Sequence, residues 1–317
     1  MPQKQRLNVH LYVIPTCNLK CIHCYSDAWP LNSQIDRILS IEEMANIIAD
    51  LCDNYEAAFD VEGGEFFVRK DITTLFDILP VQYLRHITLT TNGATKINMK
   101  PQVFSDLDEF RVSVEGHTDE LQRSIRGISL RPVMKTCKWL MDNGVPVTLR
   151  ITLHQKNHLY LAEMLDYYLN LGFSRFSFYE FQASGRGVPY ANEYALNTAQ
   201  MEDVLKQLVV TKLDDAIDVF KVSLSSRRSR MIQEFSESLR FNGLKTLDIS
   251  GAASLTINYN GVLGVCPWNV TNENIGSLQI NNFSLNIRDL IDTGRLDHSC
   301  SHCSSNRIQR YSLLPSA

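Results

Sequence analysis

The segment Pro15-Thr16-Cys17-Asn18-Leu19-Lys20-Cys21-Ile22-His23-Cys24-Tyr25-Ser26 places three cysteines within eight residues, spaced C-x3-C-x2-C. Thiolates this close together can hold one iron–sulfur cube from a single loop. A cube that is bound by only three cysteines has one iron without a protein ligand. The segment therefore predicts a cluster with one iron free to bind another molecule.

This spacing resembles the signature of the radical S-adenosylmethionine (radical SAM) superfamily, with His23 at the position where that signature has an aromatic residue. In the family, the open iron chelates the methionine amine and carboxylate of SAM, and an electron from the cube releases a 5′-deoxyadenosyl radical. The resemblance implies a SAM-binding [4Fe-4S] cluster on Cys17, Cys21 and Cys24. A zinc site would need a fourth ligand, and a disulfide cluster would need a secreted protein.

Composition is that of a soluble globular protein, with 317 residues, 44% hydrophobic and 21% charged. A net charge of −4 gives no basic field, so we do not expect nucleic acid as a partner. The first residues resemble neither a signal peptide nor a membrane span. Eight cysteines without such a signal predict reduced thiols, and so a cytoplasmic protein with no membrane partner.

Six apolar segments are typical of strands, and helical patterns lie between several of them. The predicted strands are 7–14, 57–61, 86–90, 110–114, 147–153 and 175–179; the predicted helices are 40–51, 72–79, 131–143 and 159–171, and later ones 198–213 and 227–239. Ser40, with Glu43 three residues on, predicts a capping box at the start of the first helix. Strands that alternate with helices predict an α/β fold with a parallel sheet. Right-handed crossovers would curl it into a partial (β/α)6 TIM-like barrel, the fold that the family resemblance implies for about residues 7–190.

The chain after residue 190 loses this rhythm, so we predict three parts: a radical SAM partial barrel (1–190), a helical bridging segment (191–250) and a small cysteine-bearing extension (251–317). Asn260-Gly261 between apolar runs predicts a hairpin. The hairpin, Cys266 and the Cys300-x2-Cys303 pair resemble the twitch or SPASM extension of radical SAM enzymes.

That second resemblance implies one auxiliary [4Fe-4S] cluster on Cys266, Cys300 and Cys303, with a fourth ligand that is not a cysteine. His298, His302, Asp297, a substrate or another exogenous ligand are candidates for it. A zinc site of three cysteines and His302 is the alternative, because Cys3His is a sound zinc ligand set.

Polar residues at the carboxyl ends of the predicted strands are the candidate SAM contacts, since barrel enzymes carry their functional groups there. The resemblance implies such contacts for His23, Gly63, Gly64, Glu65, Asn92, Ser113, Glu115 and Arg150. Simple turns at Gly63-Gly64 and Asn92-Gly93, and a surface salt bridge at Arg150, are the structural alternatives. No catalytic acid, base or radical-quenching residue is identified.

The leading functional hypothesis is a radical SAM oxidoreductase-type maturase that installs a crosslink or similar modification in a ribosomally synthesised precursor peptide (RiPP). The alternatives are a dehydrogenase or rearrangement enzyme on a small-molecule natural-product or cofactor precursor, and a zinc-stabilised, non-enzymatic binding protein. The resemblance also implies a reductant such as flavodoxin or ferredoxin. No leader-binding domain is expected before the barrel, so a peptide substrate would call for a separate leader-peptide-binding protein.

Overall fold

Six neighbouring parallel strands form the centre of the computed structural model, which describes residues 4–210, 219–223, 245–248, 253–265, 276–277, 283–292 and 310–314. Their order in the sheet is β1-β4-β5-β6-β7-β8, which follows the chain. The strands are β1 (Arg6–Tyr12), β4 (Glu56–Glu62), β5 (Ile87–Thr91), β6 (Glu109–Val114), β7 (Val147–Leu153) and β8 (Arg175–Glu180). All six predicted strands are present, and the α/β prediction is confirmed.

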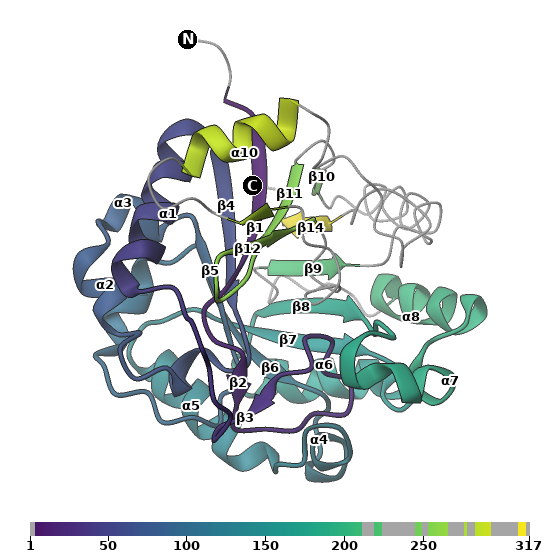
Figure 1. The fold of residues 1–317 in the computed structure, drawn as a ribbon. Helices are drawn as coiled ribbons and strands as arrows, with labels where there is room; N and C mark the ends of the chain where they lie inside the picture. Colours follow the sequence, from purple (N-terminus) through teal and green to yellow (C-terminus); the bar gives the residue numbers. More distant parts are fainter. Residues whose placement is uncertain are drawn as a thin grey trace.

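Helices cover the outer face of this curved sheet, as Figure 1 shows. They are α1 (Ile41–Asn54), α2 (Thr74–Ile78), α3 (Val81–Leu84), α4 (Asp119–Arg126), α5 (Leu130–Asp142) and α6 (Leu161–Asn170). The predicted capping box of α1 is confirmed, because Ser40 Oγ accepts from Glu43 N and Glu43 Oε2 accepts from Ser40 N. Helix α4 was not predicted, although Thr118 caps its start and Gly127, in the left-handed conformation, ends it.

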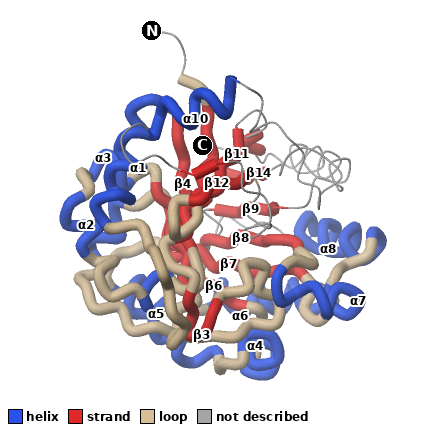
Figure 2. The backbone as a smooth tube through the Cα atoms, in the orientation of Figure 1, coloured by secondary structure: helices blue, strands red, loops and turns tan. Residues whose placement is uncertain are grey.

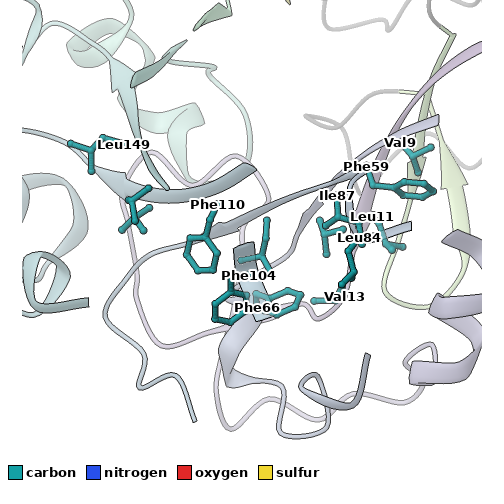
Figure 3. Packing of buried hydrophobic residues seen from close by; sticks show 14 of the residues in the cluster. Val9, Leu11, Val13, Phe59, Phe66, Leu84, Ile87, Phe104, Phe110 and Leu149 are labelled. Atoms are coloured by element: carbon teal, nitrogen blue, oxygen red, sulfur yellow. The ribbon is translucent and has the colours of Figure 1, made fainter. Parts of the chain in front are cut away.

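The core lies between the sheet and these helices (Figure 3). Aromatic rings fill the space beneath β4 and β6: Phe104 and Phe110 have ring centroids 4.8 Å apart, and Phe66 lies beside Phe76 at 6.1 Å. Such edge-to-face pairs add to the free energy that apolar burial contributes. This packing fixes the sheet whose carboxyl-end loops carry the predicted site.

Strands from the last third of the chain extend both edges of the six-strand centre (Figure 2). On one edge, β11 (Ala253–Ile257) pairs parallel with β1 and antiparallel with β12 (Val262–Gly264), which confirms the predicted hairpin, and β13 (Gly276–Ser277) follows. On the other edge, β9 (Val219–Ser223) pairs parallel with β8, and β14 (Arg310–Leu314) and β10 (Lys245–Asp248) continue it.

The remaining described elements are short or peripheral. They are β2 (Thr16–Cys17), β3 (Trp29–Pro30), η1 (Phe66–Val68), η2 (Pro101–Asp106), η3 (His158–Tyr160), η4 (Gly185–Tyr190), α7 (Ala191–Tyr194), α8 (Thr198–Val210) and α10 (Phe283–Asp292). A helical pattern at 227–239 lies outside the described residues. Among the helices that the structure describes, none combines the length and the apolar character needed to cross a membrane.

Candidate functional site

The predicted site residues gather around one pocket at the carboxyl ends of the barrel strands. Its lining includes the following predicted residues: Cys17, Cys21, His23, Cys24, Gly63, Gly64, Glu65, Asn92, Ser113 and Arg150. Glu115 is fully buried, and its carboxylate contacts the His23 ring. The three tail cysteines, Cys266, Cys300 and Cys303, lie outside the described residues. The structure therefore brings together residues from the loops after β1, β4 and β5 and from β6 and β7.

The three thiols of the cysteine loop (residues 15–28) all face this pocket as free cysteines. Burial raises the pKa of the Cys17 thiol to about 12 and also raises that of Cys21. Such thiols keep their protons until a metal displaces them. Three soft ligands from one loop fit an iron–sulfur cluster with one open iron. The described residues contain no group of three His, Cys, Asp or Glu side chains arranged for a single metal ion.

Arg186, from η4 after the last barrel strand, holds the cysteine loop at several points. Its Nε donates to Cys21 O at 3.1 Å, its Nη1 donates to Ala28 O at 2.6 Å, and its backbone N donates to Cys24 O at 3.0 Å. The guanidinium thus holds two carbonyl groups of the loop with its planar fork, which a lysine could not reproduce. No local sequence pattern predicts this role for Arg186, because Cys21 lies 165 residues earlier in the chain.

The Gly63-Gly64 turn packs directly against the start of the same loop. Gly64 N donates to Ile14 O at 2.7 Å, and Glu65 N donates to Thr16 O at 3.0 Å. A Cβ on Gly63 would lie 2.6 Å from Ile14 O, so a side chain has no room there. In this structure, the glycines allow two backbone segments to touch where a ligand pocket begins.

Glu65 connects the turns after β4 and β5. Its carboxylate accepts from Thr91 Oγ1 at 2.6 Å, Asn92 N at 2.7 Å and Phe67 N at 3.2 Å. Burial raises the pKa of Glu65, although these hydrogen bonds oppose that shift. The Asn92 side chain in turn donates to Asn18 Oδ1 at 2.8 Å. The turns after β4 and β5 are therefore linked to the cysteine loop by a continuous set of hydrogen bonds.

A buried charged cluster lies beneath His23, with Glu115 at its centre. Glu115 Oε1 lies 2.8 Å from His23 Nε2 and 2.6 Å from Arg126 Nη2, and Glu115 Oε2 lies 3.4 Å from His154 Nε2. Arg126 Nη1 also reaches Cys21 Sγ at 3.9 Å. Although burial opposes it, the charges of His23 and Arg126 hold the pKa of Glu115 well below its usual range.

Sequence reasoning missed Arg126 and His154 in this cluster. The cap at Thr118 and the terminator Gly127 were the available signals for α4, whose last residue is Arg126. The charged side chains around Glu115 fix the orientation of His23. They also place the positive charge of Arg126 beside Cys21, a predicted ligand of the iron–sulfur cluster. Positive charge beside a thiolate favours its ionised form.

Arg150 projects from β7 into the barrel interior and is held there by two neighbours. Its guanidinium carbon lies 4.4 Å from the ring centroid of Tyr179, and its Nη1 lies 3.5 Å from Glu62 Oε2. Burial lowers the pKa of Arg150, but the acidic groups of Glu62, Tyr179 and Tyr25 together outweigh burial, so the pKa is raised. Arg150 is therefore a fixed cation at the pocket and is largely shielded from solvent, not a surface salt bridge.

The family model described as the radical SAM superfamily matches residues 11–172, which is just over half of the chain. The chain belongs to the radical SAM superfamily. The matched range contains the cysteine loop, the Gly63–Glu65 turn and the barrel strands β4 to β7.

Two curated proteins are similar to about half of this chain. The antilisterial bacteriocin subtilosin biosynthesis protein AlbA of Bacillus subtilis is 27% identical over 179 residues, covering 54% of this chain and 38% of that protein. The Fe-coproporphyrin III synthase of Methanosarcina barkeri is 27% identical over 181 residues, covering 56% and 44%. The matched region thus spans less than half the length of either relative.

A solved structure extends the likeness beyond the radical SAM match. SuiB of Streptococcus suis, bound to its precursor peptide SuiA, is similar with a TM-score of 0.72, 14% identity and coverage of 94% of this chain and 68% of that chain. At this identity the likeness shows a shared fold. The shared fold confirms the α/β architecture predicted for this chain.

Proposed function

We propose that this chain reductively cleaves SAM and uses the radical to modify a ribosomally synthesised precursor peptide, by a crosslink or a similar change. The observation that carries the proposal is the convergence of Cys17, Cys21 and Cys24 on one pocket with the Gly63–Glu65 turn. When bound, the [4Fe-4S] cluster and SAM together supply a 5′-deoxyadenosyl radical that abstracts hydrogen from the substrate.

The residues of the pocket have distinct proposed roles. The three thiolates hold the cluster, and the carbonyls of Gly63 and Gly64 with the Glu65 carboxylate face the SAM amine, a cation that such oxygens suit. Arg150 offers a planar fork to the SAM carboxylate. Ser113 and Asn92 offer polar contacts, and His23 lies between the cluster loop and Glu115. Asn92 and Glu65 are already joined to each other, so they hold their positions before SAM binds.

A peptide substrate is supported by two of the similar proteins. AlbA is a bacteriocin biosynthesis protein, and the SuiB structure contains a precursor peptide. The proposal includes a reductant such as flavodoxin or ferredoxin, a separate leader-peptide-binding protein and a cytoplasmic location. The described cysteines are free thiols, which suits a reducing compartment.

A small-molecule substrate is the second candidate, and one observation favours it. The Fe-coproporphyrin III synthase is as similar in sequence to this chain as AlbA is. A radical enzyme of this second kind would act on a natural-product or cofactor precursor and would need the same cysteine pocket.

Anaerobic reconstitution with iron and sulfide tests the shared part of both candidates. We expect about four irons for one cube, a spectrum that changes on adding SAM, and release of 5′-deoxyadenosine after reduction. Cys17→Ala, Cys21→Ala and Cys24→Ala should each abolish that release. Cys52→Ala, which alters a buried thiol on α1, is the matched control and should retain it. Zinc in place of iron, or no deoxyadenosine from the unaltered protein, would refute the proposal.

The proposed auxiliary [4Fe-4S] cluster on Cys266, Cys300 and Cys303 needs a separate test. A second cube would raise the iron content to about eight per chain, whereas a zinc site would give four irons and one zinc. Cys300→Ala should leave SAM cleavage largely intact and stop formation of the modified product. Full turnover by this variant would show that the tail cluster has no part in catalysis.

A further inference from the structure

A second cavity, of about 310 Å³, adjoins the pocket that the three cysteines of the loop line, which we call the cluster pocket. Of the residues that line this second cavity, only Gly63 and Gly64 are proposed SAM contacts. The two hollows share Ser26, Gly63 and Gly64 in their linings. The remaining wall of the second one comes from the end of β1 and the start of the cysteine loop, from Trp29 on β3, and from the β11–β12 turn with Tyr259. We call it the Trp29 cavity.

The aromatic wall of the Trp29 cavity is held in place before any ligand binds. Trp29 N donates to Pro15 O at 2.8 Å, and the Trp29 ring meets the Tyr259 ring edge-to-face with centroids 5.8 Å apart. Tyr259 O accepts from Leu39 N at 2.6 Å. Trp29 nevertheless keeps 40% of its surface exposed. A large ring that is fixed yet open to solvent is a feature of ligand-binding surfaces.

The chemistry of the lining selects against anionic ligands. The described residues that line the Trp29 cavity are all neutral, and they combine aromatic and aliphatic side chains with the amides of Asn258 and Asn260. Burial raises the pKa of Tyr259, and the negative charge of Asp36 raises it further. The charged group that acts on this wall is therefore an anion. Phosphates and carboxylates would therefore meet no compensating cation from the described lining, whereas burying an unpaired charge is costly.

The size of the cavity suits a large apolar side chain. A cavity of about 150 Å³ lined by apolar groups holds a benzene molecule, and the Trp29 cavity is about twice as large. Peptide-binding sites commonly join such a side-chain pocket to polar groups that pair with the peptide backbone. Amide side chains supply both donors and acceptors for that purpose.

We propose that the Trp29 cavity binds an aromatic or large aliphatic side chain of a peptide substrate, and that the adjoining peptide segment reaches the cluster pocket past Ser26. This inference rests on the proposed peptide-modifying function and assigns its substrate class. Trp29 and Tyr259 stack on the side chain, and Asn260 faces the peptide backbone. The selection is for uncharged over anionic side chains, which separates a peptide of this kind from an anionic small molecule.

The test measures binding of capped tripeptides, acetyl-Gly-X-Gly-amide, to the reconstituted enzyme with SAM, by saturation-transfer NMR. We expect X = Phe and X = Leu to bind at least about tenfold more tightly than X = Asp, which corresponds to about 1.4 kcal/mol. Tyr259→Ala should weaken binding of the Phe peptide about tenfold, because it removes one ring of the aromatic wall. Equal binding of the Asp and Phe peptides would overturn the inference.

A second variant guards against a local loss of folding in Tyr259→Ala. Asn260→Asp keeps the oxygen that accepts from Val262 N at 3.2 Å but adds a negative charge to the wall. It should shift preference toward X = Lys, while Asn192→Asp, an equal charge change on exposed α7, should not. Unchanged selectivity in Asn260→Asp would also overturn the inference.

Release of 5′-deoxyadenosine, measured without peptide, separates this inference from the proposed function. Normal release together with unselective peptide binding would refute the Trp29 cavity assignment alone. Selective peptide binding without any release would refute the radical chemistry and leave a peptide-binding cavity.

Discussion

Gly64 faces the carbonyl oxygen of Thr16 so closely that a Cβ on Gly64 would lie 2.0 Å from it. That distance is far inside van der Waals contact, and the obstacle is backbone, which cannot rotate away. The Gly63-Gly64 turn and the cysteine loop therefore have one relative position, which is fixed by the absence of a side chain. This contact determines where Cys17, the residue after Thr16, is presented to the pocket.

Gly64→Ala is expected to displace the cysteine loop and to lower cluster incorporation by tenfold or more, measured as iron per chain after reconstitution. Gly127→Ala is the control, because a Cβ there meets nothing within 4 Å. It should cost only about 1 kcal/mol for its left-handed backbone and should retain a full cluster. Equal iron content in the two variants would contradict the proposed role of the Gly64 contact.

Arg186→Gln should lower the free energy of unfolding by about 2–3 kcal/mol, since it removes charge-assisted hydrogen bonds to Cys21 O and Ala28 O. Arg186→Lys should recover only part of this loss, because an ammonium cannot span both carbonyls. Chemical denaturation of the cluster-free protein measures the free energy of unfolding of each variant. Arg123→Gln, at an exposed ion pair on α4, should change stability by less than about 0.5 kcal/mol.

Glu115→Gln should destabilise the fold by about 3–5 kcal/mol at neutral pH, because it leaves the buried Arg126 charge without its partner. The folded-state pKa of Glu115 is depressed. Its contribution is therefore present above the unfolded pKa of about 4.3 and is lost as the pH falls through the folded value. Unfolding measured from pH 7 downward should show a weaker acid dependence in the variant. Parallel curves for the two proteins would argue against this assignment.

Arg150→Lys should weaken SAM binding about tenfold while leaving the iron content unchanged. The guanidinium lies over Tyr179 and beside Glu62, and a lysine would lose both the stacked plane and the fork for a carboxylate. Equilibrium titration of the reconstituted protein with SAM measures the effect. Arg131→Lys, on α5 away from the pocket lining, provides the comparison and should bind SAM normally. A loss of iron in Arg150→Lys would instead indicate a structural role.

Local patterns in the sequence predicted the strands and the hairpin because each depends on residues close together in the chain. The Ser40–Glu43 capping box and the Asn260-Gly261 turn are examples, and both are confirmed. Helix α4 was missed because it is short and only two of its eight residues, Leu121 and Ile125, are apolar. The structure places ten of the predicted site residues around one pocket, and their roles stay predictions.

Contacts between distant residues explain what the sequence did not reveal about the site. Arg126 and Cys21 are 105 positions apart, and nothing in either local pattern predicts their meeting. Glu115 was expected to contact SAM, and that role stays a prediction. Strand β6 ends at Val114, and the backbone N of Glu115 then donates to Gln122 Oε1 at 2.9 Å. After this turn, the Glu115 carboxylate contacts His23 Nε2 at 2.8 Å.

The parallel pairing of β1 with β11 joins residues 7–11 to residues 253–257. During translation, the first strand leaves the ribosome long before its second neighbour has been made. That edge of the sheet stays open until residues 253–257 have emerged. The cysteine loop follows this strand in the chain, so we expect delivery of iron and sulfide to succeed only after residues 253–257 have been made. A nascent chain arrested before residue 253 should accept little iron.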